Sequence, residues 1–389
     1  MRFGTMPASA SAFLSLSTYH VQVTGNLEQA FRDSVSFAQT YPRDREAHAG
    51  LSGICQWLGK YPKAIEAGNR VIEIDPDFPP GPVNAAWSYI FVDGLPEAEA
   101  VLQKAVARKL EVPDLFLLSY YVAFLKGDQA AMERAAAAAS DKPGAEDWML
   151  SAQASVSAYS GRLQQSRAMV RRAMDLALQG KQLERAAMYQ AGAAVREAFF
   201  GNVLEARRNA RAALQLSQSR DVEYGAAFAL AVAGDTLASQ ALAKRLERFP
   251  EDSIVQFTYL PVLGALAALK HGDPAHALDL LRTAAPYDLS IPGSWFGFFG
   301  NLYPIYVRGQ AYLEAHRPAE AAAEFQRILD HPGILFSDPV GVAARMQMAK
   351  AYAAMGDQAK AHAAYQNLLD LWKNADEDIP LGKEARAAH

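Results

Sequence analysis

A short turn motif recurs at a constant interval of 34 residues in the first half of the chain. The motif is a turn residue, usually glycine, followed five positions later by a small residue. Its first five copies begin at Gly25, Gly59, Asp93, Gly127 and Gly161. Unrelated helical hairpins have no reason to keep one length, so the constant period predicts a single supersecondary unit that is stacked repeatedly.

Five further copies follow at intervals of 33 to 44 residues and begin at Gly201, Gly234, Gly272, His316 and Gly356. Glycine adopts the left-handed conformation that ends a helix, and the Asp or Asn that often follows it is suited to the N-cap of the next helix. The small residue lets two helices approach closely. The ten copies therefore predict about ten antiparallel helical pairs.

Small side chains hold most of the close-contact positions, which are Ala30, Ala64, Ala98, Met132, Ser166, Ala206, Ser239, Ala277, Ala321 and Ala361. Pro42 and Pro76 each lie 17 residues after their turn and are predicted to end the second helix of the pair.

The period, these positions and the sequence IDPD at Ile74–Asp77 make residues 11–375 similar to the tetratricopeptide-repeat family. The resemblance implies an all-α superhelical solenoid with a concave groove lined by the first helix of each pair. The family's Trp and Gly at the fourth and eighth repeat positions are mostly missing. We expect a flexible segment at residues 1–10 and a capping segment at residues 376–389.

The interval between Gly272 and His316 is about ten residues longer than the period. The extra residues fall in Ala285–Pro304, which is rich in aromatic residues, glycine and proline. Linkers are rarely this aromatic, so we expect a structured loop. Its aromatic side chains are predicted either to pack on neighbouring helices or to form part of a docking patch.

Composition excludes several classes of protein. The formal charge of −4 and the pI near 6.1 argue against nucleic acid as a partner. Cys55 is the only cysteine, so no internal disulfide or cysteine-based metal site is expected, and the residue is predicted to be a small buried hydrophobe. Neither a signal peptide nor an apolar run long enough to cross a bilayer occurs, which predicts a cytoplasmic chain without membrane insertion.

The segments that resemble catalytic or phosphate-binding motifs do not match the spacing or the residues that those motifs require. Gly53–Lys60 has five residues between its glycines where a P-loop has four, and Tyr61 follows where a magnesium ligand is needed. His271 and His276 are five residues apart, off a common helix face. We therefore predict no catalytic residue, no metal site and no cofactor, and an enzyme is the least favoured class.

Several segments are more specifically similar to the tetratricopeptide tails of bacterial eukaryotic-like serine/threonine kinases, of a kind common in acidobacteria. They include AYSGRL (Ala158–Leu163), EAFFGN (Glu197–Asn202), APYDL (Ala285–Leu289), LYPIYVRGQAYL (Leu302–Leu313) and LLDLWKNADEDIP (Leu368–Pro380). No G-x-G-x-x-G loop, H-R-D loop or D-F-G occurs. The resemblance implies a regulatory or sensory tail that acts with a kinase domain in cis or in trans, and an extracytoplasmic location if that kinase is membrane-anchored.

The leading hypothesis is a non-enzymatic scaffold that binds a protein or peptide in the concave groove. Aromatic residues that map to the first helices, or to the long interval, are the candidate binding residues: Trp87, Tyr121, Phe124, Tyr224, Phe228, Trp295, Phe298, Tyr303 and Tyr306. Aromatic side chains there would hold an apolar or extended peptide segment. The alternative is that most of them pack helix against helix.

Overall fold

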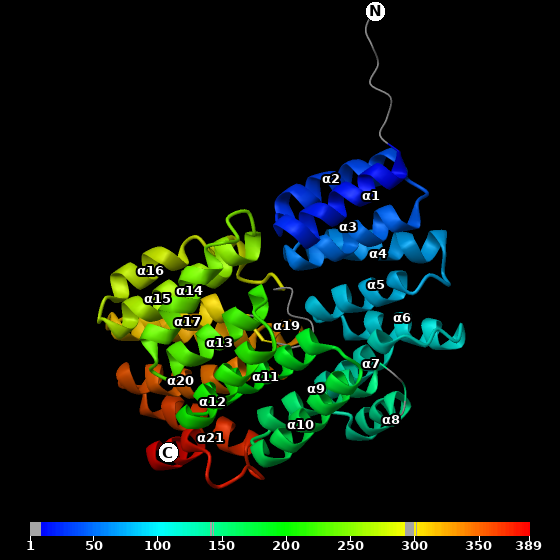
Figure 1. The fold of residues 1–389 in the computed structure, drawn as a ribbon. Coiled ribbons are helices and arrows are strands. Elements are labelled where there is room, and N and C mark those ends of the chain that lie inside the picture. The colour runs from blue at the N-terminus through cyan, green and yellow to red at the C-terminus, as the bar shows by residue number, and fades with distance from the viewer. Residues whose placement is uncertain (1–8, 141, 143, 292–298, 301) are drawn as a thin grey trace, which may run out of the picture. The chain divides into compact units, whose positions relative to one another are not determined.

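The computed structural model describes residues 9–140, 142, 144–291, 299–300 and 302–389 (Figure 1). Within these residues the chain forms helices and turns and no β-strand, which confirms the predicted all-α class. Ten antiparallel helical pairs follow one another along these residues. The helices group into two compact units, a division that the repeat period did not indicate.

The N-terminal unit comprises residues 1–135 and 249–256. Its pairs are α1 (Ala10–Tyr19) with α2 (Leu27–Thr40), α3 (Arg45–Trp57) with α4 (Tyr61–Ile74), α5 (Pro80–Phe91) with α6 (Leu95–Ala107), and α7 (Pro113–Lys126) with α8 (Gln129–Ala139). The boundary of the unit falls within α8. A π-helical turn, η1 (His20–Thr24), extends α1.

The C-terminal unit comprises residues 136–248 and 257–389. Its pairs are α9 (Glu146–Tyr159) with α10 (Leu163–Gln179), α11 (Leu183–Phe199) with α12 (Val203–Leu216), α13 (Arg220–Val232) with α14 (Thr236–Leu246), α15 (Leu260–Lys270) with α16 (Pro274–Leu281), α17 (Tyr303–Glu314) with α18 (Pro318–Leu329), and α20 (Val340–Ala354) with α21 (Gln358–Leu371). Short elements complete the chain: η2 (Val255–Tyr259), η3 (Ala285–Tyr287), α19 (Pro332–Leu335) and α22 (Pro380–Ala388).

The predicted turns have the expected backbone conformation. All ten turn residues have positive φ angles, between 57° and 84°, including Asp93 and His316, which are not glycine. Side chains of Asn26, Asp273 and Asp357 then cap the second helices by accepting a backbone N–H three residues ahead, at 3.0, 2.9 and 3.1 Å. The nine small residues at the close-contact positions and Met132 at the tenth are all buried, as close helix contact requires.

One segment of the N-terminal unit comes from far along the sequence. The backbone N–H of Leu27 donates to Ser253 Oγ at 3.0 Å, and the N–H of Ser253 donates to the carbonyl of Gly25 at 3.0 Å. A Cβ atom on Gly25 would lie 2.1 Å from a carboxylate oxygen of Asp252. Glycine is therefore required at this first turn for close approach as well as for its positive φ.

The C-terminal tail folds back within its own unit. The predicted capping segment, residues 376–389, contains α22, and the N–H of Leu381 donates to the carbonyl of Phe200 at 3.2 Å. The N–H of Asp376 donates to the carbonyl of Gly161 at 2.9 Å. Trp372 donates from its indole nitrogen to the carbonyl of Tyr159 at 2.9 Å. The tail is thus attached to the turns of the fifth and sixth pairs.

Ion pairs hold the described residues at the start of the long interval in place. Asp288 is buried just after η3, and its carboxylate accepts two bonds from Arg308 on α17, at 2.8 and 2.9 Å. Arg327 on α18 donates to the same carboxylate at 2.8 Å, and Arg308 also contacts Glu324 at 3.1 Å. One carboxylate therefore links η3 to both helices of the ninth pair.

A second buried carboxylate lies before α20. Asp338 accepts the backbone N–H of Val340 at 2.8 Å, and the hydroxyl of Tyr303 donates to its other oxygen at 3.3 Å. Burial raises the pKa of Asp338 to about 8, although the nearby positive charge of Arg196 opposes the shift. Asp338 is therefore protonated in the folded chain near neutral pH.

This protonation makes stability depend on pH. The carboxyl of the unfolded chain has the ordinary pKa of an aspartate, 3.8, so the native state binds the extra proton between that pH and about 8. Stability should consequently fall as pH rises through this window, by up to about 1.4 kcal/mol per pH unit. Asp338→Asn keeps an acceptor for Val340 and should flatten that slope. Denaturant unfolding of both chains across the window measures the difference, and identical slopes would contradict the assignment.

Candidate partner-binding clefts

The predicted binding aromatics of the N-terminal unit lie mostly in its interior. Trp87 and Tyr121 are buried and Phe124 is half-buried. The ring of Trp87 lies 5.8 Å from that of Phe91 and 6.3 Å from that of Tyr121. These side chains pack α5 against α7, as the packing alternative proposes for them.

The same holds in the C-terminal unit, where Tyr224, Phe228, Tyr303 and Tyr306 are all buried. The rings of Phe228 and Tyr303 are 4.5 Å apart, and Tyr224 stacks on Tyr259 at 3.6 Å. Burial raises the pKa of the Tyr224 and Tyr303 phenols well above their ordinary value. Helices α13 and α17 thus fill the space between them with these aromatics and offer no open aromatic groove there.

Trp295 and Phe298 lie outside the residues that the structure describes. Their neighbour Phe299 is described and is buried. Its ring lies against α13 at Gly225, where a Cβ atom would come within 2.7 Å of the ring. The absence of a side chain at Gly225 therefore makes room for Phe299.

Open clefts that could hold a partner occur instead between the second helices of the N-terminal unit. Three clefts of about 510, 780 and 540 Å³ follow one another along it. The first lies between α2 and α4 over α3, the second between α4 and α6 over α5, and the third between α6 and α8 over α7. Each pair after the first thus contributes one cleft.

The clefts are copies of one another at the repeat period. Eight residues that line the first cleft are matched by lining residues of the second exactly 34 positions later. The first set is Val35, Ala38, Gln39, Pro42, His48, Ala67, Arg70 and Glu73, and the second is Asn69, Ile72, Glu73, Pro76, Pro82, Val101, Lys104 and Ala107. The repeat geometry creates the clefts, so their side chains decide what they can bind.

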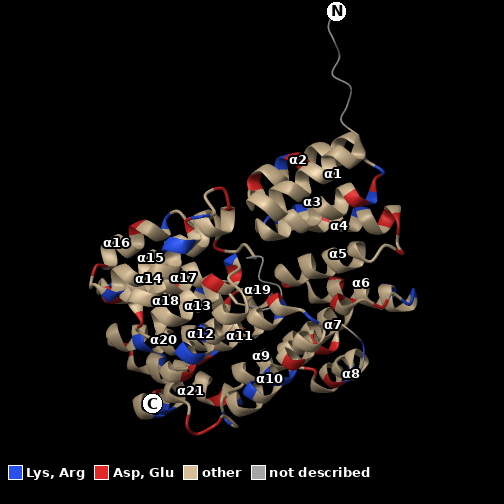
Figure 2. Cartoon of the chain, viewed as in Figure 1, with Lys and Arg blue, Asp and Glu red and all other residues tan. Residues whose placement is uncertain are grey.

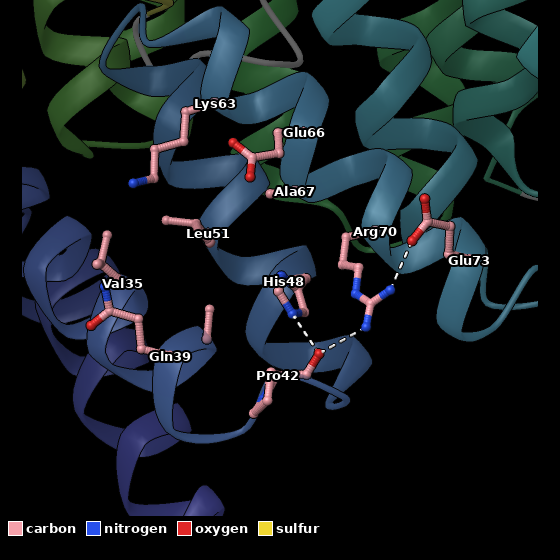
Figure 3. Close-up of a pocket in the computed structure, with 11 residues that line it drawn as sticks. Val35, Gln39, Pro42, His48, Leu51, Lys63, Glu66, Ala67, Arg70 and Glu73 are labelled. Carbon is pink, nitrogen blue, oxygen red and sulfur yellow. Dashed lines mark hydrogen bonds and ion pairs between the residues drawn. The ribbon is translucent and has the colours of Figure 1, made fainter.

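Figure 3 shows the first cleft. Val35, Leu51 and Ala67 form an apolar floor, and Lys63, Glu66, Arg70 and Glu73 stand along the rim. Arg70 is held in place, since it donates to Glu73 at 2.8 Å and to the carbonyl of Pro42 at 3.4 Å.

Lys63 and Glu66, by contrast, form no ion pair within the described part of the chain, and the ammonium of Lys63 lies over the ring of Phe31, 5.5 Å from its centroid. Both charges are exposed and remain available to a ligand.

The third cleft is the more apolar. Leu102, Val106 and Val122 line it together with Ala131 and Ala135, and the side chain of Val106 is 66% exposed. An ion pair between Lys126 and Glu99, at 2.8 Å, stands at its edge. Reasoning from first-helix aromatics missed this surface. Apolar residues on the exposed side of second helices, such as Val106, are the sequence signal that could have found it.

A metal site, a reactive cysteine and a membrane-spanning helix are three other features that the described residues could hold. No group of three or more His, Cys, Asp or Glu side chains among them is placed to hold a metal ion. Cys55 is buried, as the sequence predicts, and burial raises the pKa of its thiol to about 12, so the thiol is unreactive. No described helix is both long enough and apolar enough to cross a bilayer.

No protein-family model matches the chain, and no curated protein is similar to it. Among solved structures it is similar to yeast Tom70, with 13% identity over 97% of this chain and 95% of that one and a TM-score of 0.38. It is also similar to the tetratricopeptide domain of P58(IPK), with 15% identity over 98% and 97% and a TM-score of 0.26. A tetratricopeptide repeat protein from Parabacteroides merdae has 12% identity over 87% and 98%, with a TM-score of 0.30. At these values the likenesses carry no weight for function.

Proposed function

We propose that this chain is a non-catalytic scaffold that binds a protein or peptide segment along the row of clefts in the N-terminal unit. The supporting observation is that three consecutive pairs present one cleft each, with an apolar floor and a charged rim. A segment crossing the pairs would meet the same arrangement in each. Surfaces repeated in this way suit extended ligands.

The side chains indicate the kind of segment. The floors at Val35, Ala67 and Val106 would take apolar side chains. Arg70 and Lys104 occupy the same repeat position in consecutive pairs, and Lys63 adds a third cation at the first cleft. The first cleft also carries the unpaired Glu66. An amphipathic segment with alternating apolar and acidic residues, and one basic residue opposite Glu66, fits this pattern.

A peptide library displayed on phage and selected on the immobilised chain tests the proposal. We expect amphipathic sequences to be selected and Val106→Glu to weaken their binding at least tenfold, because it places a carboxylate on the apolar floor of the third cleft. Val106 is largely exposed, so the change should alter stability by only about 0.5 kcal/mol or less. Binding is measured by fluorescence anisotropy of labelled peptides.

Leu204→Glu is the matched control, because Leu204 is an exposed apolar residue on α12, a helix that lines none of the three clefts. It should leave binding unchanged. A library that yields no binder, or selected peptides that bind both variants as tightly as the original chain, would contradict the proposal.

Two narrower proposals come from the sequence. The first is that the half-buried Phe124 and, separately, Trp295 and Phe298 of the long interval contact a partner. The second, an alternative function, rests on the resemblance to kinase tails and makes the chain a regulatory or sensory tail acting in cis or in trans. Reading the coding DNA upstream of Met1 in frame tests it, because an adjoining kinase domain would be encoded there.

A further inference from the structure

The C-terminal unit has a cleft built in the same way as those of the N-terminal unit. It lies between α10 and α12 over α11 and has a volume of about 260 Å³. Its lining residues stand at the same distances from the turn glycines Gly161 and Gly201 as those of the first cleft do from Gly25 and Gly59. Matched pairs are Val35 with Arg171, Leu51 with Ala193, and Ala67 with Asn209. The two clefts are therefore one repeat position with different side chains.

This cleft is positively charged. Four arginines and two glutamates line it, a net charge of +2, whereas two cations and two carboxylates line the first cleft. Asp378 of the tail acts on Arg167 and offsets one of these charges. The surrounding sequence is also basic, since residues 161–219 contain ten Lys and Arg and four Asp and Glu, in a chain whose net charge is −4. Figure 2 shows blue segments on α10 and α12. Such a surface attracts an anion.

The carboxylates of the cleft leave one arginine over. Glu197 accepts two hydrogen bonds from Arg167, at 2.7 and 2.8 Å, and Glu205 accepts from one terminal nitrogen of Arg208. Arg171 forms no ion pair or hydrogen bond with the residues that the structure describes. Arg171 and Arg208 are both exposed, and a guanidinium has five N–H groups, so most of their donors are open to a ligand.

A fixed amide donor lines the same cleft. The side chain of Gln190 donates to the amide oxygen of Asn209 at 2.8 Å, which sets the orientation of the Asn209 amide. The nitrogen of that amide donates to no acceptor in the described ranges. The cleft thus offers two guanidinium groups and one oriented N–H donor.

We propose that this cleft binds the phosphate group of a phosphorylated side chain, through Arg171, Arg208 and Asn209. Such a group carries about −1.5 to −2 charges and three acceptor oxygens, which two guanidinium groups and an amide can satisfy together. A carboxylate has one charge and two oxygens and would leave donors unused. Every lining residue is described and none is aromatic, so no ring is present to stack on a nucleic-acid base. The site belongs to the C-terminal unit and is independent of the partner proposed for the N-terminal clefts.

Isothermal titration calorimetry of the full chain with N-acetyl-O-phosphoserine amide tests the proposal. We expect saturable binding of one molecule per chain and no binding of N-acetylserine amide. Arg171→Gln and Arg208→Gln should each weaken binding about tenfold or more, because each removes a charged donor. Both side chains are exposed, so the melting temperature should not change. A titration without saturable binding would overturn the proposal.

Arg172→Gln is the matched control. Arg172 follows Arg171 on α10 and its side chain is 57% exposed, but it pairs with Glu146 at 3.7 Å and does not line the cleft. The same loss of charge there should weaken binding by less than about twofold. Equal weakening by the two substitutions would show general attraction to a basic surface and overturn the proposal. Tighter binding of inorganic phosphate than of the phosphoserine probe would assign the cleft to the free ion instead, and displacement of the probe by oligouridylate would assign it to nucleic acid.

Discussion

Replacing Asp288 with alanine is expected to destabilise the C-terminal unit by about 3 kcal/mol, the lower end of the usual cost of removing one partner of a buried ion pair, because Arg308 keeps its contact with Glu324. The side chain of Arg308 is only 11% exposed, and both of its terminal nitrogens donate hydrogen bonds to the carboxylate of Asp288. Arg327 loses its bond to the same carboxylate. Without these three hydrogen bonds, η3 is released from α17 and α18. Denaturant unfolding followed by circular dichroism measures the loss.

Two further variants show whether burial is the cause. Asp279→Ala removes one partner of an exposed ion pair with Arg282 and should cost about 0.5 kcal/mol or less. The double variant Asp288→Leu, Arg308→Met removes both buried partners and should lose less stability than Asp288→Ala alone. Equal losses for Asp279→Ala and Asp288→Ala would show that the buried network does not hold this part of the fold.

Replacing Trp372 with alanine is expected to cost about 3–5 kcal/mol, as removal of a buried aromatic side chain usually does. Trp372 is buried, donates to the carbonyl of Tyr159, and meets the ring of Phe200 edge to face at 5.2 Å between centroids. At about 2–4 °C per kcal/mol for a unit of this size, the melting temperature should fall by roughly 6–20 °C.

The same change should free the C-terminal tail. Trp372 lies against Gly382 of α22, and Lys373, Lys383 and Arg386 follow it as trypsin sites. Limited trypsin digestion should therefore shorten the Trp372→Ala chain at protease levels that leave the original chain intact. Trp372→Phe keeps most of the apolar contact but loses the hydrogen bond, so its loss should be intermediate. A resistant Trp372→Ala chain with an unchanged melting temperature would contradict this role.

Local features were predictable from the sequence alone. Turn residues such as Gly59 and Gly161 have the left-handed conformation expected of them, and the small residues, such as Ala64, are buried where two helices touch. Both depend on backbone sterics and on contacts within one hairpin, which recur at every period. The burial of Cys55 was predictable for the same reason, because an apolar helix position in a regular hairpin faces its partner.

Tertiary structure decided which faces stay open. The sequence marks Trp87 and Tyr224 as large aromatics on first helices, but their burial depends on Tyr121 and Tyr259, which come from other pairs. The attachment of the tail at Phe200 joins residues 181 positions apart, and no local pattern encodes it. The clefts follow from the spacing of successive second helices, a property of stacking. The period thus determined each hairpin, whereas long-range packing determined which side chains of those hairpins remain available to a partner.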